Sequence, residues 1–256
     1  MRPACVVIGA TTLAIAVVFA PINTSSERLN NQDKVIYQPT GSEGRLAGKI
    51  SFEGQPPQPK KIDGSADPAC EANDRELYTE DIIVKAGKLA NVFVYVESGD
   101  ALNWYSFEAP TTDVSVAHNG CQLTPHVLGM QLQQTLKIAN DDSTSHNSHL
   151  IPKSNPDWNQ SQPQGAEPLA HKFTAPELFI PLKCNQHPWE KALVSVLDHP
   201  FFAVSRLNGA YSISGLPPGQ YTVVARHERF GEQRSEVSVG VKETKTLDFS
   251  FKAPDK

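Results

Sequence analysis

The sequence predicts an all-β chain, and three observations lead to that prediction. Residues 44–54 (GRLAGKISFEG) alternate apolar and polar side chains, as a strand with one buried face does. Residues 88–99 (KLANVFVYVESG) are rich in β-branched and aromatic side chains. No long stretch has the period of an amphipathic helix, and the C-terminal part contains an Asn-Gly turn at 208–209 and a Leu-Pro-Pro-Gly turn at 216–219.

Composition and charge limit the class of protein. The chain has 256 residues, 39% of them hydrophobic, with 20 Pro, 16 Gly and a net charge of −5. This length is enough for two small globular domains. Mild acidity offers no basic face to a nucleic acid, so no nucleic-acid partner is expected. Since no Ser-His-Asp arrangement, phosphate-binding Gly loop or paired-carboxylate motif stands out, a binding or electron-transfer protein is favoured over an enzyme.

The N-terminus predicts export. Residues 5–20 form an uncharged run of sixteen after Arg2, the length of a secretory signal rather than of a full membrane span. Pro21 is a poor neighbour for cleavage, so an uncleaved N-terminal anchor, and with it a membrane tether, is the alternative. Residues 21–43, rich in Asn, Ser, Thr and Gln, are expected to be a flexible tether. The predicted location is therefore secreted or periplasmic.

Two short motifs predict a metal site. Residues 179–190 (FIPLKCNQHPWE) are an apolar strand that runs into Cys184 and His187, and a thiolate and an imidazole separated by two residues can bind one ion. Residues 140–149 (NDDSTSHNSH) follow another apolar strand and contain His146. Two imidazoles and one thiolate form the ligand set that suits copper. Zinc would require a further Cys or His pair, which the sequence lacks.

These motifs resemble the cupredoxin (plastocyanin-like) family, in which a His followed by Asn lies on one strand and a Cys-x-x-His loop closes the copper site. Residues 121–147 also resemble the central hairpin of that family, and the resemblance covers roughly residues 113–197. It implies a Greek-key sandwich that holds copper through His146, Cys184 and His187. It also implies single-electron transfer with a redox partner protein.

The fourth ligand position departs from the family pattern. A Met is common three to five residues after the loop His, but here those positions are Glu190, Lys191 and Ala192. We expect Glu190 as the axial ligand, where a carboxylate would favour Cu(II), lower the reduction potential and move the colour away from intense blue. The alternative is that Glu190 points to solvent and that the axial place is empty or taken by water or a backbone carbonyl.

Other polar residues have secondary roles in this prediction. His149, a little after His146, could replace it, add a fourth nitrogen or form a second site if both imidazoles point to one face. His126 is a weaker candidate of the same kind. Asn147 is expected to hold the ligand loop by side-chain hydrogen bonds, outside the metal's own ligands.

The cysteines allow one disulfide. The sequence has four Cys, and Cys5 lies in the predicted leader. If Cys184 is a ligand, Cys70 and Cys121 remain and can pair, which an exported setting permits. The alternative is two separate thiols.

Residues 201–231 (FFAVSRLNGAYSISGLPPGQYTVVARHERFG) resemble the carboxypeptidase regulatory-like (transthyretin-like) sandwich. The first two strands of that fold would be 44–54 and 88–99, and about a hundred residues separate them from the Asn-Gly turn, too many for a plain loop. We therefore expect a copper domain at 100–197 inserted into a sandwich made of 44–99 and 198–256. The alternative is a tandem layout in which residues 44–99 belong to the copper domain.

The sequence thus predicts an exported copper protein that transfers single electrons. A non-redox module is the alternative. Such a module would handle copper, or would bind carbohydrate or protein through the regulatory-like sandwich.

Overall fold

The computed structural model describes Met1 and residues 34–71 and 76–253. Strands dominate this part of the chain, and its two helices are short: α1 (Pro68–Glu71) and α2 (Asp100–Trp104). Neither helix in the described residues is long and apolar enough to cross a membrane. The predicted leader, Met1 excepted, and residues 21–33 of the predicted tether lie outside the described residues. The all-β prediction is confirmed.

The first sandwich consists of two sheets that enclose one core. One sheet has the order β16 (Phe202–Val204), β5 (Phe93–Gly99), β18 (Gly219–His227) and β19 (Gly231–Val239). The other has the order β17 (Ala210–Leu216), β2 (Gly44–Glu53), β4 (Lys88–Leu89) and β3 (Val84–Lys85), with β20 (Thr244–Thr246) and β21 (Phe249–Lys252) also paired to β2. The alternating apolar residues of β2, among them Leu46, Ile50 and Phe52, face this core.

The second sandwich is built from residues 114–197. Its five-stranded sheet has the order β12 (Trp158–Gln162), β11 (His146–Leu150), β14 (Glu177–Lys183), β15 (Lys191–Leu197) and β9 (Val127–Gln131). Its four-stranded sheet has the order β13 (Leu169–His171), β10 (Leu136–Asn140), β7 (Val114–His118) and β8 (Leu123–Thr124). The pairs β7 with β10 and β9 with β15 are parallel, so the chain crosses between sheets and is not a simple meander.

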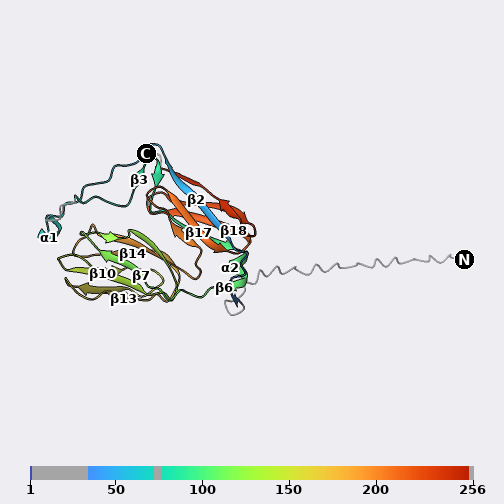
Figure 1. Cartoon of the computed structure of the whole chain (residues 1–256), viewed down its shortest axis with the longest axis horizontal. Coiled ribbons are helices and arrows are strands. Elements are labelled where there is room, and N and C mark those ends of the chain that lie inside the picture. The colour runs from blue at the N-terminus through green and yellow to red at the C-terminus, as the bar shows by residue number, and fades with distance from the viewer. Residues whose placement is uncertain (2–33, 72–75, 254–256) are drawn as a thin grey trace.

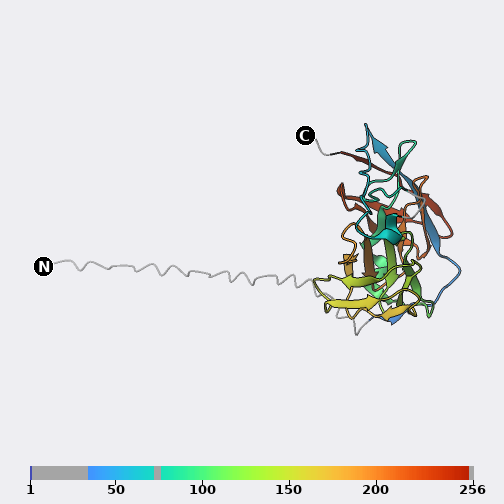
Figure 2. The same cartoon turned by 90° about the vertical axis from the view of Figure 1, so that its left-hand side faces the viewer.

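Strands on either side of the second sandwich pair with one another. β5 pairs antiparallel with both β16 and β18, and β2 pairs with β17. Residues 114–197 therefore lie, in the sequence, between two neighbouring strands of a single sheet. Figure 1 shows the first sandwich, with β2, β17 and β18, beside the second, with β7, β10, β13 and β14, and the turned view of Figure 2 shows the two stacked one above the other.

A third apolar cluster joins the sandwiches. Phe93 and Tyr95 of β5 point into it, while Val94 and Val96 point into the first core. Side chains of β15 also alternate between two cores. Leu193 lies in the shared cluster, and the residues directly before and after it lie in the second core. Both strands are thus buried on both faces, which explains why their sequences read as continuous apolar runs rather than as alternating patterns.

The structure differs from the sequence prediction at the domain edges. Residues 34–43 were expected to be a flexible tether, but β1 (Val35–Ile36) pairs with β6 (Tyr105–Ser106). The cause is the apolar and aromatic character of this stretch, because Tyr37 packs against the rings of Tyr105 and Phe107. Residues 101–107, assigned to the copper domain from the sequence, pack partly against the first core.

A long connection leaves the first sandwich after β2 and carries α1 to the second sandwich. In Figure 1, α1 lies far from the sheets that contain β2 and β17. A disulfide between Cys70 of this connection and Cys121 holds it there, with Cα atoms 5.7 Å apart. Segment 54–83, called here the covering segment, therefore brings residues of the first sandwich to the second.

Candidate metal centre

Two neighbouring strands and one loop bring the predicted ligands together. His146 is the first residue of β11, and β14 ends at Lys183, directly before Cys184. Because β11 and β14 are antiparallel neighbours, the start of one lies at the end of the other. The ligand loop, residues 184–190, is closed by backbone hydrogen bonds from Glu190 to His187 and from Cys184 to Glu190.

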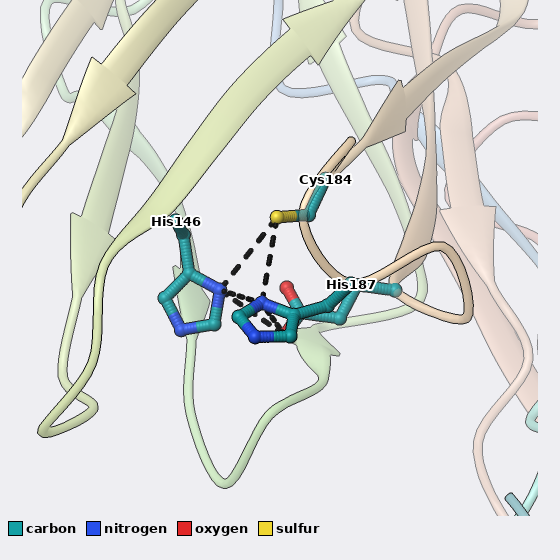
Figure 3. A group of neighbouring side chains, drawn as sticks. His146, Cys184 and His187 are labelled. Carbon is teal, nitrogen blue, oxygen red and sulfur yellow. Dashed lines mark hydrogen bonds and ion pairs between the residues drawn. The ribbon is translucent and has the colours of Figure 1, made fainter. Parts of the chain in front are cut away.

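The ligand atoms converge on one point. The Nδ1 atoms of His146 and His187 lie 2.9 Å apart, and Cys184 Sγ lies 3.8 Å from the first and 3.6 Å from the second. Figure 3 shows these three side chains pointing toward one another, with Cys184 and His187 on one loop and His146 on a separate strand. One atom from each of His146, Cys184, His187 and Glu190 lies within 4.8 Å of the others, so the four could hold a metal ion.

Glu190 is buried beside this group and does not point to solvent. Only 1% of the residue is exposed. Its Oε1 lies 3.2 Å from His146 Nδ1 and 3.7 Å from His187 Nδ1. This oxygen is buried and has no hydrogen-bond partner among the described residues. Because a buried carboxylate oxygen without a hydrogen bond is costly, a cation between this oxygen and the two imidazoles would stabilise it.

The spacing fits a small transition-metal ion. In a tetrahedral site with metal–nitrogen bonds of about 2.0 Å and metal–sulfur bonds of about 2.3 Å, two nitrogens lie about 3.3 Å apart and a nitrogen and a sulfur about 3.5 Å apart. The observed separations of 2.9, 3.6 and 3.8 Å lie on either side of these values. The donor set, one thiolate, two imidazoles and a carboxylate, is of the kind that binds copper or zinc.

The outer ring nitrogen of each candidate imidazole is hydrogen-bonded to a carboxylate. His146 Nε2 donates to Asp142 Oδ2 at 3.1 Å, and His187 Nε2 donates to Asp67 Oδ2 at 3.1 Å. Such hydrogen bonds place the proton on Nε2 and leave the Nδ1 lone pair for the metal. Asp67 lies on the covering segment, so the first sandwich contributes to the surroundings of a centre that the second sandwich carries.

The electrostatics of the centre favour a positive charge. Burial lowers the pKa of His146, but Asp142, Cys184 and Glu190 outweigh it and raise that pKa to about 11. Burial raises the pKa of Glu190, but the hydrogen bond with His118 and the ion pair with His146 outweigh it, and the pKa lies below its ordinary value. A bound metal ion would take the place of the proton at His146 Nδ1.

Sequence reasoning missed three residues of this centre. His118, the last residue of β7, stacks on His146 with ring centroids 4.3 Å apart, and its Nδ1 donates to Glu190 Oε2 at 2.5 Å. A buried polar residue at the end of an apolar strand was the available signal for His118. Asp142 lies only four residues before His146, whereas no local pattern points to Asp67.

Asn147 contacts the ligand loop through its side chain. Its Oδ1 accepts from the Asn185 amide at 2.7 Å and lies 3.6 Å from Cys184 Sγ, while its Nδ2 donates to Asn159 Oδ1 at 2.8 Å. The residue therefore ties the ligand loop to β11 and β12.

His149 is not part of the group. It lies three residues after His146, so on β11 the two imidazoles point to opposite faces, and the expectation of a shared face is wrong. Its Nδ1 lies 3.3 Å from Asn185 Oδ1 and its Nε2 lies 3.1 Å from Asp157 Oδ2.

His126 also lies elsewhere, at the contact between the sandwiches. Its Nδ1 donates to the Lys191 carbonyl at 2.9 Å, and its Nε2 pairs with the Glu228 carboxylate. Met130 is buried in the core of the second sandwich.

Comparison with known families finds a match for the C-terminal part of the chain. Residues 183–252 match the model of the carboxypeptidase regulatory-like domain. The match contains all strands of the first sandwich from β16 onward, and it begins at Lys183, the last residue of β14 in the second sandwich. The resemblance seen in the sequence is confirmed for this part of the chain. No curated protein matches the chain.

Solved structures similar to this chain are cupredoxins and a copper enzyme. A novel purple cupredoxin from Nitrosopumilus maritimus is 23% identical over 33% of this chain and 99% of its own, with a TM-score of 0.29. Amicyanin from Paracoccus versutus is 16% identical over 40% of this chain and 96% of its own, with a TM-score of 0.30. A copper-containing nitrite reductase from Thermus scotoductus is 22% identical over 34% of this chain, which spans only 23% of that enzyme, with a TM-score of 0.31. Scores this low do not define the fold, which the strand pairing above describes.

Proposed function

We propose that this chain binds one copper ion through His146, Cys184, His187 and Glu190 and transfers single electrons. The observation that carries the proposal is the convergence of four buried ligand atoms, one of which, Glu190 Oε1, has no hydrogen-bond partner among the described residues. A bound copper ion would supply the change between Cu(II) and Cu(I).

The chain's own residues set how such an ion would behave. The Cys184 thiolate and the two imidazoles suit both oxidation states, whereas the Glu190 carboxylate favours the higher charge. Asp142 and Asp67 fix the imidazole rings, so little reorganisation would accompany electron transfer. Burial keeps bulk water from the ion, because the four candidate ligands are at most 3% exposed.

A second candidate function is copper handling without electron transfer. The observation in its favour is the cover over His187, whose outer nitrogen is bonded to Asp67 and is not open to a partner protein. A stored ion has to be shielded from the surroundings in this way. Electron transfer instead requires a partner protein to come close to a residue that binds the metal.

Copper titration of the purified full chain tests the first proposal. We expect one tightly bound Cu(II) with a thiolate charge-transfer band in the visible and an electron paramagnetic resonance signal. Cys184→Ser should abolish the band. His149→Gln, a neighbour outside the group, is the matched control and should leave it unchanged. A colourless protein that ignores copper would reject the proposal, and a bound copper that resists oxidation and reduction would favour the second function.

We further infer from the N-terminal sequence that the chain is exported, secreted or periplasmic, with a membrane tether if the leader is retained. An unidentified redox partner protein, and carbohydrate or protein contact through the regulatory-like domain, belong to the same proposal. Fractionation of cells that express the full chain, with N-terminal sequencing of the product, tests export and cleavage together.

A further inference from the structure

The Cys70–Cys121 disulfide lies directly beside the candidate metal centre. Cys70 Sγ is within 4.8 Å of a His187 nitrogen, and Cys121 Sγ is within 4.8 Å of a Glu190 carboxylate oxygen. Both cysteines are buried, at 3% and 1% exposure. The sulfur atoms of the three described cysteines, Cys70, Cys121 and Cys184, therefore gather around the same ligand loop.

The surroundings of the disulfide are anionic. The carboxylates of Asp67 and Asp142 each lie within 4.8 Å of one of its sulfurs, as Glu190 does. In the described residues these three carboxylates pair with histidines, hydroxyls and amides, and none of their ion pairs involves Lys or Arg. Three carboxylates without a Lys or Arg partner favour a cation at this place.

A surface hollow lies on one side of the buried disulfide. Ile62 and Trp189 pack against the two cysteines. The same two side chains line a surface hollow of about 250 Å³. A small reductant in this hollow would contact side chains that pack against the cluster of the two cysteines.

We propose that Cys70 and Cys121 form a second, redox-controlled site that binds Cu(I). A dithiol reductant would break the S–S bond, supply two electrons and two protons, and itself become a disulfide. The two adjacent thiols would then release their protons to solvent and bind one Cu(I) as a pair of soft thiolates. The inference deepens the proposed function by adding a second copper position, but its two ligands are not those of the first site.

Anaerobic Cu(I) titration against a chromogenic Cu(I) chelator tests this site. All proteins are full chains that carry Cys5→Ser, because Cys5 lies outside the described residues and would add a thiol. The disulfide is reduced with a phosphine, which is removed before copper is added. Near-ultraviolet circular dichroism checks that the reduced protein and each variant remain folded.

The expected stoichiometry separates the two sites. Oxidised protein should bind one Cu(I) and reduced protein two. The reduced double variant Cys70→Ser, Cys121→Ser should return to one. Reduced Cys184→Ser should keep the equivalent at Cys70 and Cys121, and X-ray absorption should show two sulfur ligands on that copper, a measurement that stands even if the double variant does not fold.

Two results would overturn the second site: reduction that adds no equivalent to the copper bound by the oxidised protein, or an added equivalent that survives in the double variant. Failure of the first site looks different, since oxidised protein would then bind no copper while reduction would still create one equivalent.

Discussion

Glu190 is the residue that most distinguishes this centre chemically. A negative oxygen next to copper stabilises Cu(II), and at an effective dielectric constant of 20 a unit charge about 4 Å away contributes about 4 kcal/mol. Replacing Glu190 with Met or Gln should therefore raise the reduction potential by roughly 100 mV or more, and Met should also make the visible spectrum bluer. Protein-film voltammetry and absorption spectroscopy measure both effects.

Glu167→Gln, a change at an exposed carboxylate, is the control. An unchanged potential in both Glu190 variants would remove Glu190 from the ligand set.

At the same scale, local sequence patterns pointed to the candidate ligand residues but not to the residues that hydrogen-bond to them. Cys184 and His187 lie in one short loop and His146 follows an apolar strand, so local patterns were enough to find them. His118 and Asp67 reach the centre from 72 and 120 residues away from their partners in the ligand loop. Such contacts depend on how the sheets stack and where the covering segment runs, which no local pattern encodes.

The covering segment is the part of the chain that connects the first sandwich to the candidate metal centre. Its Asp67 also accepts from the Thr144 hydroxyl at 2.6 Å, and these bonds hold the segment against both halves of the site. Removing a carboxylate that accepts a hydrogen bond from a metal-binding histidine commonly weakens metal binding about 10- to 100-fold. Asp67→Asn should do so here, as measured by competition with a copper chelator. Asp157→Asn, which changes a carboxylate beside the uninvolved His149, should have no effect, and equal affinities in the two variants would mean that Asp67 does not position His187.

At the level of strands, the sequence predicted β2 and β5 because their composition is strongly β-prone. It assigned residues 34–43 to a tether because Asn, Ser, Thr and Gln dominate the stretch before them. The structure differs there because a few aromatic side chains, Tyr37 foremost, find partners in residues 105–107. Tertiary packing thus decided an element that composition alone leaves open.

For the whole molecule, buried neutral histidines should make stability depend on pH. Burial lowers the pKa of His227 to about 4, although the charges of Glu228 and Asp81 oppose this shift. Since the unfolded chain titrates near 6.5, the native state is fully favoured above pH 6.5 and loses up to about 3 kcal/mol as pH falls to 4. Urea unfolding of wild type and His227→Gln at several pH values measures this, and the gap between them should narrow as the pH falls. A gap that stays constant would show that His227 does not titrate in this range.

The contact between the two sandwiches depends on a position where only glycine fits. A Cβ at Gly129 of β9 would lie 2.6 Å from the rings of Phe93 and Phe202, both in the shared apolar cluster. Because the cluster is close-packed, Gly129→Ala should force these rings apart and destabilise the protein by about 1–3 kcal/mol. Chemical unfolding measures the loss of stability.

Phe202→Leu in the Gly129→Ala background should recover part of this loss, since the substitution removes one of the two opposing rings. A double-mutant cycle isolates that coupling. Additive effects of the two substitutions would mean that Gly129 does not set the distance between the sandwiches.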